Sequence, residues 1–116
     1  MKEESLFNYN TLMLYVNGNN VLGERIKRMI VAEIPKDLAK MEAALHKEDW
    51  GFVGAMAHKI KPIIQMCGNK KLYDCVESIE KDGKQHLALH TMDSRLRNLK
   101  LQIALLLTEI EHHTQY

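Results

Sequence analysis

Apolar residues recur at spacings of three and four along most of this chain, and this periodicity constrains the fold more than any other feature. Strand-like alternation never persists, and only two prolines interrupt the 116 residues. The segment over about residues 92–112 shows the pattern most strongly, with an apolar stripe made of Leu96, Leu99, Ile103, Leu106, Leu107 and Ile110. Such a stripe predicts an amphipathic helix with one face in a core.

The same reasoning predicts four further helices, over about residues 9–16, 21–45, 50–67 and 69–81. Pro35 is expected to kink the second of these or split it in two. Asp49 is the expected N-cap of the next helix, and Gly68 its left-handed C-terminal cap. Asp82-Gly83 is expected to close the helix over 69–81.

Short connections between long amphipathic helices favour antiparallel neighbours. The predicted fold is therefore all-α, an antiparallel up-down four-helix bundle with an extra short N-terminal helix. The length fits a single domain over residues 1–116, with its core over about 9–112. The apolar and charged fractions, 46% and 27%, are those of an ordinary soluble globular protein.

Charge and apolar runs exclude several classes of function. Sixteen basic against fifteen acidic residues leave no broad field of one sign, so no nucleic-acid partner is expected. No apolar run is long enough to span a bilayer, so membrane insertion is not expected. The N-terminus lacks the apolar stretch of a secretory signal, and Cys67 and Cys75 form no CxxC motif. Reduced thiols and a cytoplasmic location are expected.

The helix over about 50–67 divides cleanly when His58 is taken as the reference position on a helical wheel. Its side of the wheel collects Gly51, Gly54, Ala55, Lys61, Pro62 and Gln65. The opposite side, the expected core face, collects Phe52, Val53, Met56, Ala57, Ile60, Ile63, Ile64 and Cys67. His58 is thus predicted to point away from the core, as either an idle surface histidine or a functional one.

The neighbours of this histidine suit a phosphorylated ring. Lys61 shares its face one turn on and Lys59 flanks it. A phosphoryl group on a ring nitrogen brings close to two negative charges, which ammonium groups stabilise. The alternative is that both lysines are simply solvated. Gly51, Gly54 and Ala55 leave the backbone bare, either for the approach of a partner's active site or for close packing against a neighbouring helix.

The run Ala57-His58-Lys59-Ile60-Lys61-Pro62, with Gly68 ten residues after the histidine, resembles the signature of the histidine phosphotransfer (HPt) family. The usual family pattern is Ala-His-x-Leu-Lys-Gly, followed by a glycine that closes the helix. The resemblance covers about residues 9–112. It includes Pro35, Ala43-Ala44-Leu45 and Asp49-Trp50 upstream, and Leu72, Cys75 and Ser78-Ile79-Glu80 downstream.

The resemblance implies roles for individual residues. His58 matches the phosphoacceptor, Lys61 the lysine that helps to hold the phosphoryl group, and Gly68 the turn glycine. Glu80 falls where some members place a side chain, often Gln, that hydrogen-bonds the imidazole; a glutamate there favours the protonated ring. Pro62 departs from the pattern, because it replaces a glycine, removes the helical partner of the His58 carbonyl and places a ring where a partner docks.

The function that the resemblance implies is that of a phosphoryl carrier in a two-component phosphorelay. The domain would pass the group between receiver-domain aspartates and would have no kinase activity of its own, in line with the lack of a nucleotide-binding motif. Expected partners are a response-regulator receiver domain, a hybrid sensor histidine kinase, or both. No cofactor is expected on this chain, and Mg²⁺ is expected on the receiver. A single reactive face predicts a monomer.

Two other interpretations remain open at this point. An inactive bundle that binds a signalling partner without phosphotransfer is favoured by Pro62. A metal site is suggested by His86 and His90, four residues apart, and by His112 and His113, but no cysteine or carboxylate pattern accompanies them, and no metal is expected.

Overall fold

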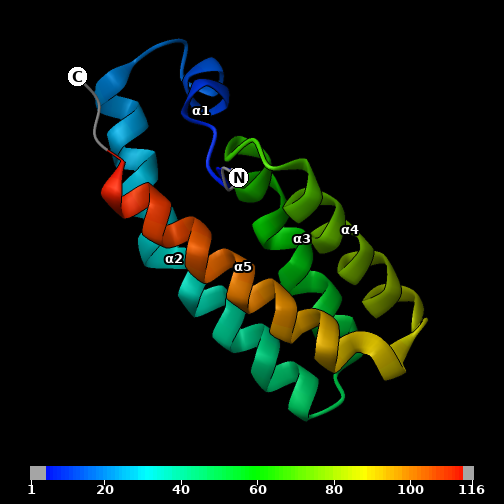
Figure 1. The fold of residues 1–116 in the computed structure, drawn as a ribbon. Coiled ribbons are helices and arrows are strands. Elements are labelled where there is room, and N and C mark those ends of the chain that lie inside the picture. Colours follow the sequence, from blue (N-terminus) through cyan, green and yellow to red (C-terminus); the bar gives the residue numbers. More distant parts are fainter. Residues whose placement is uncertain (1–4, 114–116) are drawn as a thin grey trace, which may run out of the picture.

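The computed structural model describes residues 5–113, and these residues form five α-helices and no strand. The helices are α1 (Tyr9–Tyr15), α2 (Asn20–His46), α3 (Trp50–Met66), α4 (Lys70–Gln85) and α5 (Met92–His112), with a short 3-10 turn, η1 (Leu89–Thr91), before α5. Figure 1 shows the four long helices side by side and α1 at one end of them. The predicted all-α bundle with an extra N-terminal helix is confirmed.

The long helices surround one core. Both α3 and α5 pack mainly against α2 and α4, so α3 and α5 lie at diagonally opposite corners of the bundle. Side chains from all four helices are completely buried between them, among them Ile34, Met41, Ile60, Ile64, Ile79, Leu99, Ile103 and Leu106. Each such side chain contributes about 1.5–3 kcal/mol of transfer free energy, so the apolar stripes hold the helices together.

Side-chain caps explain where most of the helices begin. The side chain of the residue before each of α1, α2, α3 and α4 accepts a hydrogen bond from the backbone N–H three positions further along the chain. These accepting residues are Asn8, Asn19, Asp49 and Asn69. Each cap is worth about 1 kcal/mol. The Asp49 cap was predicted, and so was the left-handed Gly68, whose φ is +72°.

Of the two outcomes predicted for Pro35, a kink or a split of its helix, the split is wrong, because α2 is continuous across it. A proline ring removes one helical hydrogen bond, the one to the carbonyl of residue 31. The Pro35 ring is exposed and does not interrupt the core. Ile34 and Leu38 are buried on either side and hold both halves of the helix against the same core.

The prediction that Asp82-Gly83 ends the fourth helix is also wrong, since α4 continues to Gln85 and ends at the left-handed His86. Gly83 is buried against α3. A Cβ atom there would lie 2.9 Å from both Gly54 N and Trp50 O. The glycine therefore permits a close helix contact, and packing overrides its tendency to end a helix.

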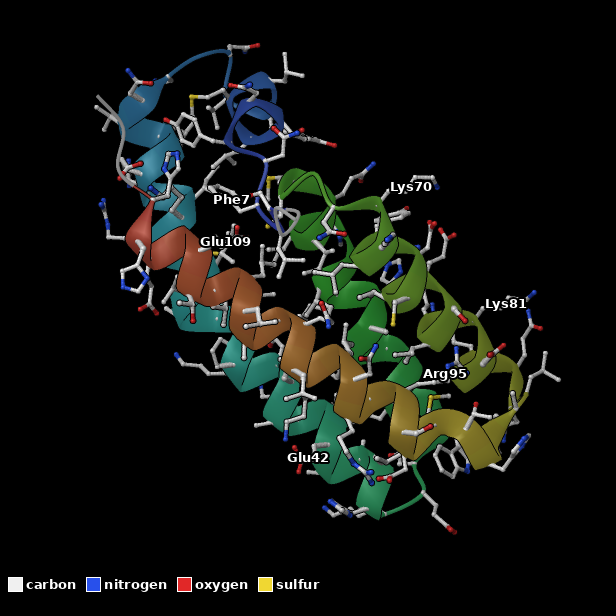
Figure 2. The ribbon with its side chains drawn as sticks, in the orientation of Figure 1. Phe7, Glu42, Lys70, Lys81, Arg95 and Glu109 are labelled. Atoms are coloured by element: carbon white, nitrogen blue, oxygen red, sulfur yellow. The ribbon has the colours of Figure 1, made fainter. Side chains whose placement is uncertain are left out.

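The segment before α1 ties two parts of the fold together. Glu109 Oε2, on α5, accepts hydrogen bonds from the backbone N–H groups of Leu6 (2.6 Å) and Phe7 (2.9 Å). Phe7 and Glu109 are labelled in Figure 2. One residue further on, Asn8 N–H donates to Cys67 O at the end of α3 (2.8 Å).

No helix within residues 5–113 combines the length and apolar character needed to cross a membrane.

Candidate functional site

His58 lies on the outer face of α3, as predicted, and its side chain is 63% exposed. Its neighbours Ala57 and Ile60 are fully buried, so the helix is fixed to the core by the opposite face. The ring is therefore held on a rigid element while remaining open to a second molecule.

The ring is not isolated, because three other charged side chains meet beside it. Glu80 Oε2, on α4, lies 2.6 Å from His58 Nδ1. The same carboxylate accepts from Lys61 Nζ (2.7 Å, Oε1) and from Lys84 Nζ (2.9 Å, Oε2). We refer to His58, Lys61, Glu80 and Lys84 as the Glu80 cluster. It joins one turn of α3 to one turn of α4.

Glu80 is the anionic centre of this cluster. Burial raises the pKa of its carboxyl group, but hydrogen bonds from Lys61, Lys84 and His58 outweigh that effect and hold the pKa at about 2. The carboxylate is thus ionised at neutral pH and can only accept hydrogen bonds. In return, its hydrogen bond raises the pKa of the Lys61 ammonium group.

The hydrogen bond determines which nitrogen of His58 is available for chemistry. Because ionised Glu80 accepts, Nδ1 must carry a proton. In the neutral ring, the lone pair then resides on Nε2. The arrangement can thus present a nucleophilic nitrogen at the surface, with a fixed carboxylate behind it and two ammonium groups nearby.

Lys59 lies in different surroundings. Its Nζ donates to Asp37 Oδ1 on α2 (2.8 Å), and Asp37 is only 1% exposed. This hydrogen bond raises the pKa of Lys59. The other carboxylate oxygen of Asp37 is buried and has no hydrogen-bond partner within residues 5–113. Lys59 and Lys61, which follow His58 in the sequence, therefore pair with carboxylates on different helices, Asp37 on α2 and Glu80 on α4.

The glycines on the His58 side of the helix separate into two kinds. Gly54 is buried against α4, where a Cβ atom would lie 3.0 Å from Glu80 O and Lys84 N. Of the two explanations left open for it, the structure supports close packing rather than a bare docking surface. Gly51 is exposed, and the nearest atom to its Cβ position is Asp49 Oδ1 at 4.0 Å.

The remaining residues predicted near the site are exposed along the same helix or at its end. Ala55, Pro62 and Gln65 all face solvent. Gly68 lies at the turn between α3 and α4, where a Cβ atom would be 2.6 Å from Thr11 Oγ1. The first turn of α1 therefore packs directly against this glycine.

Two residues expected on the core face of α3 are less buried than predicted. Phe52 is 43% exposed, and Ile63 is only partly buried. Phe52 belongs to the first turn of α3. The other six are buried as predicted: Val53, Met56, Ala57, Ile60, Ile64 and Cys67.

Lys84 was not predicted as a site residue. The pattern Asp82-Gly83 predicts the end of this helix and so places Lys84 in a connection. Its position four residues after Glu80 was the available signal, because residues at this spacing face each other on a continuous helix.

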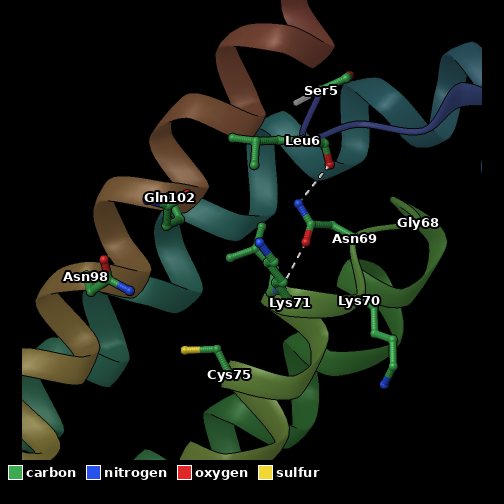
Figure 3. A pocket seen from close by; sticks show the side chains of 10 residues that line it. Ser5, Leu6, Gly68, Asn69, Lys70, Lys71, Cys75, Asn98 and Gln102 are labelled. Carbon is green, nitrogen blue, oxygen red and sulfur yellow. Dashed lines mark hydrogen bonds between the residues drawn. The ribbon is translucent and has the colours of Figure 1, made fainter. Parts of the chain in front are cut away.

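A cavity lies away from this cluster. It has a volume of about 550 Å³ and is bounded by the segment before α1, the start of α4, and Asn98 and Gln102 of α5. Figure 3 shows Asn69 bridging its wall, donating to Leu6 O and accepting from Leu72 N. None of the Glu80 cluster lines it.

Within residues 5–113 no group of three metal-ligating side chains occurs, and both cysteines are free thiols.

Comparison with known proteins identifies a family. The family model described as the Hpt domain matches residues 25–113, which include the whole Glu80 cluster and leave out α1 and the first turn of α2. No curated protein matched the chain, and no solved structure did.

Proposed function

Since this chain belongs to the Hpt domain family, whose members carry phosphoryl groups on a histidine in phosphorelays, we propose that His58 carries the phosphoryl group here. One observation supports this choice above all: an exposed imidazole on a rigid helix, with Nδ1 held 2.6 Å from an ionised carboxylate. That contact leaves Nε2 as the nitrogen available for attack.

In the proposed step, the Nε2 lone pair attacks the phosphorus of an aspartyl phosphate on a receiver domain. The bond between phosphorus and the aspartate oxygen breaks, and the aspartate leaves as a carboxylate. Since Nδ1 keeps its proton, positive charge develops on the ring of His58. The Glu80 carboxylate is placed to stabilise that charge, and the same interactions serve the reverse transfer.

Lys61 and Lys84 are the cations that we propose for the phosphoryl oxygens, because both already lie on the carboxylate beside the ring. Lys84 is the more exposed, with about half of its side chain accessible against 21% for Lys61. We therefore expect Lys84 to leave Glu80 more readily and to follow an incoming phosphoryl group. Lys59 is held by Asp37, and we assign it a structural role instead.

The expected partners are receiver domains of response regulators or of hybrid histidine kinases, with Mg²⁺ supplied by the receiver. The exposed residues around His58 offer the docking surface: Gly51, Ala55, Pro62 and Gln65. Hpt domains are phosphocarriers rather than kinases, so we propose no nucleotide-dependent activity for this one. We propose a cytoplasmic location, where Cys67 and Cys75 would stay reduced.

The test is phosphotransfer from a phosphorylated receiver in the presence of Mg²⁺, followed by intact mass. His58→Gln is the test variant, and His90→Gln, at an exposed histidine on η1, is the matched control. We expect one acid-labile, base-stable phosphoryl group on the parent and on His90→Gln, and none on His58→Gln. A phosphoryl group on His58→Gln would contradict the assignment of the residue.

The competing function is binding of a signalling partner without transfer. Pro62 is the observation that favours it, since it is exposed on the docking side where the family usually has glycine. If no receiver in a panel labels the folded protein, Pro62→Gly becomes the decisive variant. Gain of transfer would show that the proline ring blocks docking, and continued inactivity would support the binding-only function.

A further inference from the structure

His113, directly after α5, lies between the start of α1 and the first half of α2. Its ring stacks on the Tyr9 ring, with the two centroids 4.3 Å apart and the planes at 25°. The Phe7 ring meets it edge-on, with the centroids 5.6 Å apart. Lys27 of α2 contacts it from another direction, and Lys27 Nζ lies 3.0 Å from both His113 Nδ1 and His113 O. One imidazole thus joins α1, α2 and the end of α5.

The ammonium group of Lys27 determines the protonation state of this ring. The Lys27 side chain is only 6% exposed, and it also donates to the Glu24 carboxylate (3.1 Å). An ammonium group has three hydrogens to donate and cannot accept. His113 Nδ1 must therefore offer its lone pair to Lys27, so the ring is neutral and carries its proton on Nε2.

The surroundings of His113 oppose a second proton. A proton on Nδ1 would remove the lone pair and place an imidazolium 3.0 Å from a buried ammonium group. Burial and the positive charge of Lys27 lower the pKa of His113, whereas the charge of Glu24 raises it. The other titratable or charged groups around the ring are Tyr9 on α1, Arg28 on α2 and Glu111 on α5. Glu24 already accepts from Lys27, so it offsets the cation only in part.

The position of His113 allows its ring to leave without disturbing the core. The residue caps α5 with an extended backbone, at φ −71° and ψ 119°, and its N–H donates to Ile110 O. Ile110 is the last buried side chain of α5 within the described residues. Rotation about the backbone bonds of His113 therefore moves the ring into solvent and leaves the packed part of α5 in place.

We propose that His113 is a pH-sensitive latch, which fastens α1 to α2 and to the end of α5 when the imidazole is neutral and opens when it is protonated. In the open form the ring leaves the Tyr9 ring and Lys27 Nζ and is solvated. The proposal is independent of phosphotransfer.

Opening of the latch should loosen α1 without detaching it. The backbone N–H groups of Leu6 and Phe7 would still donate to Glu109, which holds the segment before α1. The first turn of α1 packs against Gly68, at the turn after α3. The latch therefore determines how firmly α1 is held against that turn.

NMR titration of the full chain between about pH 4 and about pH 8 tests the latch. The ring signals of His113 are identified by their absence in His113→Gln. Departure of the imidazole also changes the ring signals of Tyr9 and Phe7, because a stacked ring shifts the signals of its neighbours. We expect the His113, Tyr9 and Phe7 signals to change with one common midpoint, below the ordinary histidine value of 6.5. A His113 midpoint at or above 6.5, no titration of His113 in this range, or Tyr9 and Phe7 signals that do not follow it would overturn the proposal.

Variants assign the transition to the latch. His113→Gln cannot be protonated in this range, so the change in the Tyr9 and Phe7 signals should disappear. His112→Gln is the matched control, since His112 is exposed and its Nδ1 lies 2.9 Å from Thr108 O of its own helix. It should keep the transition at the parent's midpoint, and a transition that persists in His113→Gln or is lost in His112→Gln would overturn the proposal.

Lys27→Met tests the opposing charge. The substitution removes the ammonium group and leaves an apolar side chain in a buried position, so the midpoint of His113 should rise. An unchanged midpoint with helical content retained would show that Lys27 does not oppose protonation and would overturn the latch.

Discussion

Gly83→Ala should separate α3 from α4 and destabilise the bundle by about 1–2 kcal/mol. The added Cβ atom would lie 2.9 Å from Gly54 N and from Trp50 O, whereas ordinary van der Waals contact begins at 3.4 Å. Both neighbours are backbone atoms, so no rotamer change relieves the contact and the helices must separate by about 0.5 Å. Overpacking of this kind costs about 1–3 kcal/mol, and the better helix propensity of alanine returns at most about 1 kcal/mol.

The same displacement should weaken the site. His58 and Glu80 belong to the two helices that must separate, and their contact of 2.6 Å would lengthen to about 3.1 Å. We therefore expect Gly83→Ala to slow phosphoryl acceptance while the protein remains folded. Rates measured well below the unfolding transition would separate this effect from loss of folded protein.

Gly51→Ala is the matched control, because its Cβ atom would meet nothing closer than 4.0 Å. It should leave stability unchanged or raise it by up to about 1 kcal/mol through helix propensity. Urea unfolding followed by far-UV circular dichroism measures both variants, with equal m-values confirming the same extent of unfolding. A Gly83→Ala protein as stable as the parent would refute the close contact between α3 and α4.

Three further predictions follow from buried or paired groups. The carboxyl group of Glu80 has a pKa of about 2 in the folded protein, against 4.5 ordinarily. Its ionised form therefore contributes about 1–2 kcal/mol to the free energy of unfolding after solvent screening, and this contribution is present above pH 4.5 and lost as the pH falls towards 2. Glu80→Gln should remove that part of the acid dependence, as measured by urea titrations at each pH. Lys59→Met should lower the urea midpoint of unfolding, because it leaves the Asp37 carboxylate buried and unpaired. The phosphotransfer rate should stay close to that of the parent. A large loss of rate at equal helicity would mean that Lys59 binds the phosphoryl group. Burial raises the pKa of the Cys67 thiol to about 12 and also raises that of half-buried Cys75. An alkylating reagent should therefore modify Cys75 slowly in the native protein and Cys67 only after unfolding, as detected by peptide mass spectrometry. Equal labelling of both would contradict the buried position of Cys67.

Local pattern was sufficient for much of the fold. The stripe over 92–112 predicted the bounds of α5, and the wheel around His58 predicted its outward direction, because both depend only on helical periodicity. The split considered at Pro35 and the helix end predicted at Asp82-Gly83 do not occur. At each position a residue that favours a break is held inside a helix by contacts with other helices, and such contacts are not visible in a local window.

The site was predictable in part for the same reason. His58, Lys61 and Glu80 were predicted from their place in a known motif. Lys84 was not predicted, because the predicted end of its helix lies before it. The ion pair between Asp37 and Lys59 could not have been predicted from either segment alone. It depends on the relative rotation of α2 and α3, which the packing of the whole core determines.

The contact between His58 and Glu80 spans only 22 residues of chain, all within two helices joined by one tight turn. The contact of Leu6 with Glu109 spans 103. Loop-closure entropy makes short-range contacts the easier ones to form, so the His58 ring and the Glu80 carboxylate can meet in a single helical hairpin early in folding. The attachment of the N-terminal segment must wait until both ends of the chain have come together, and its loss would leave the hairpin of α3 and α4 assembled.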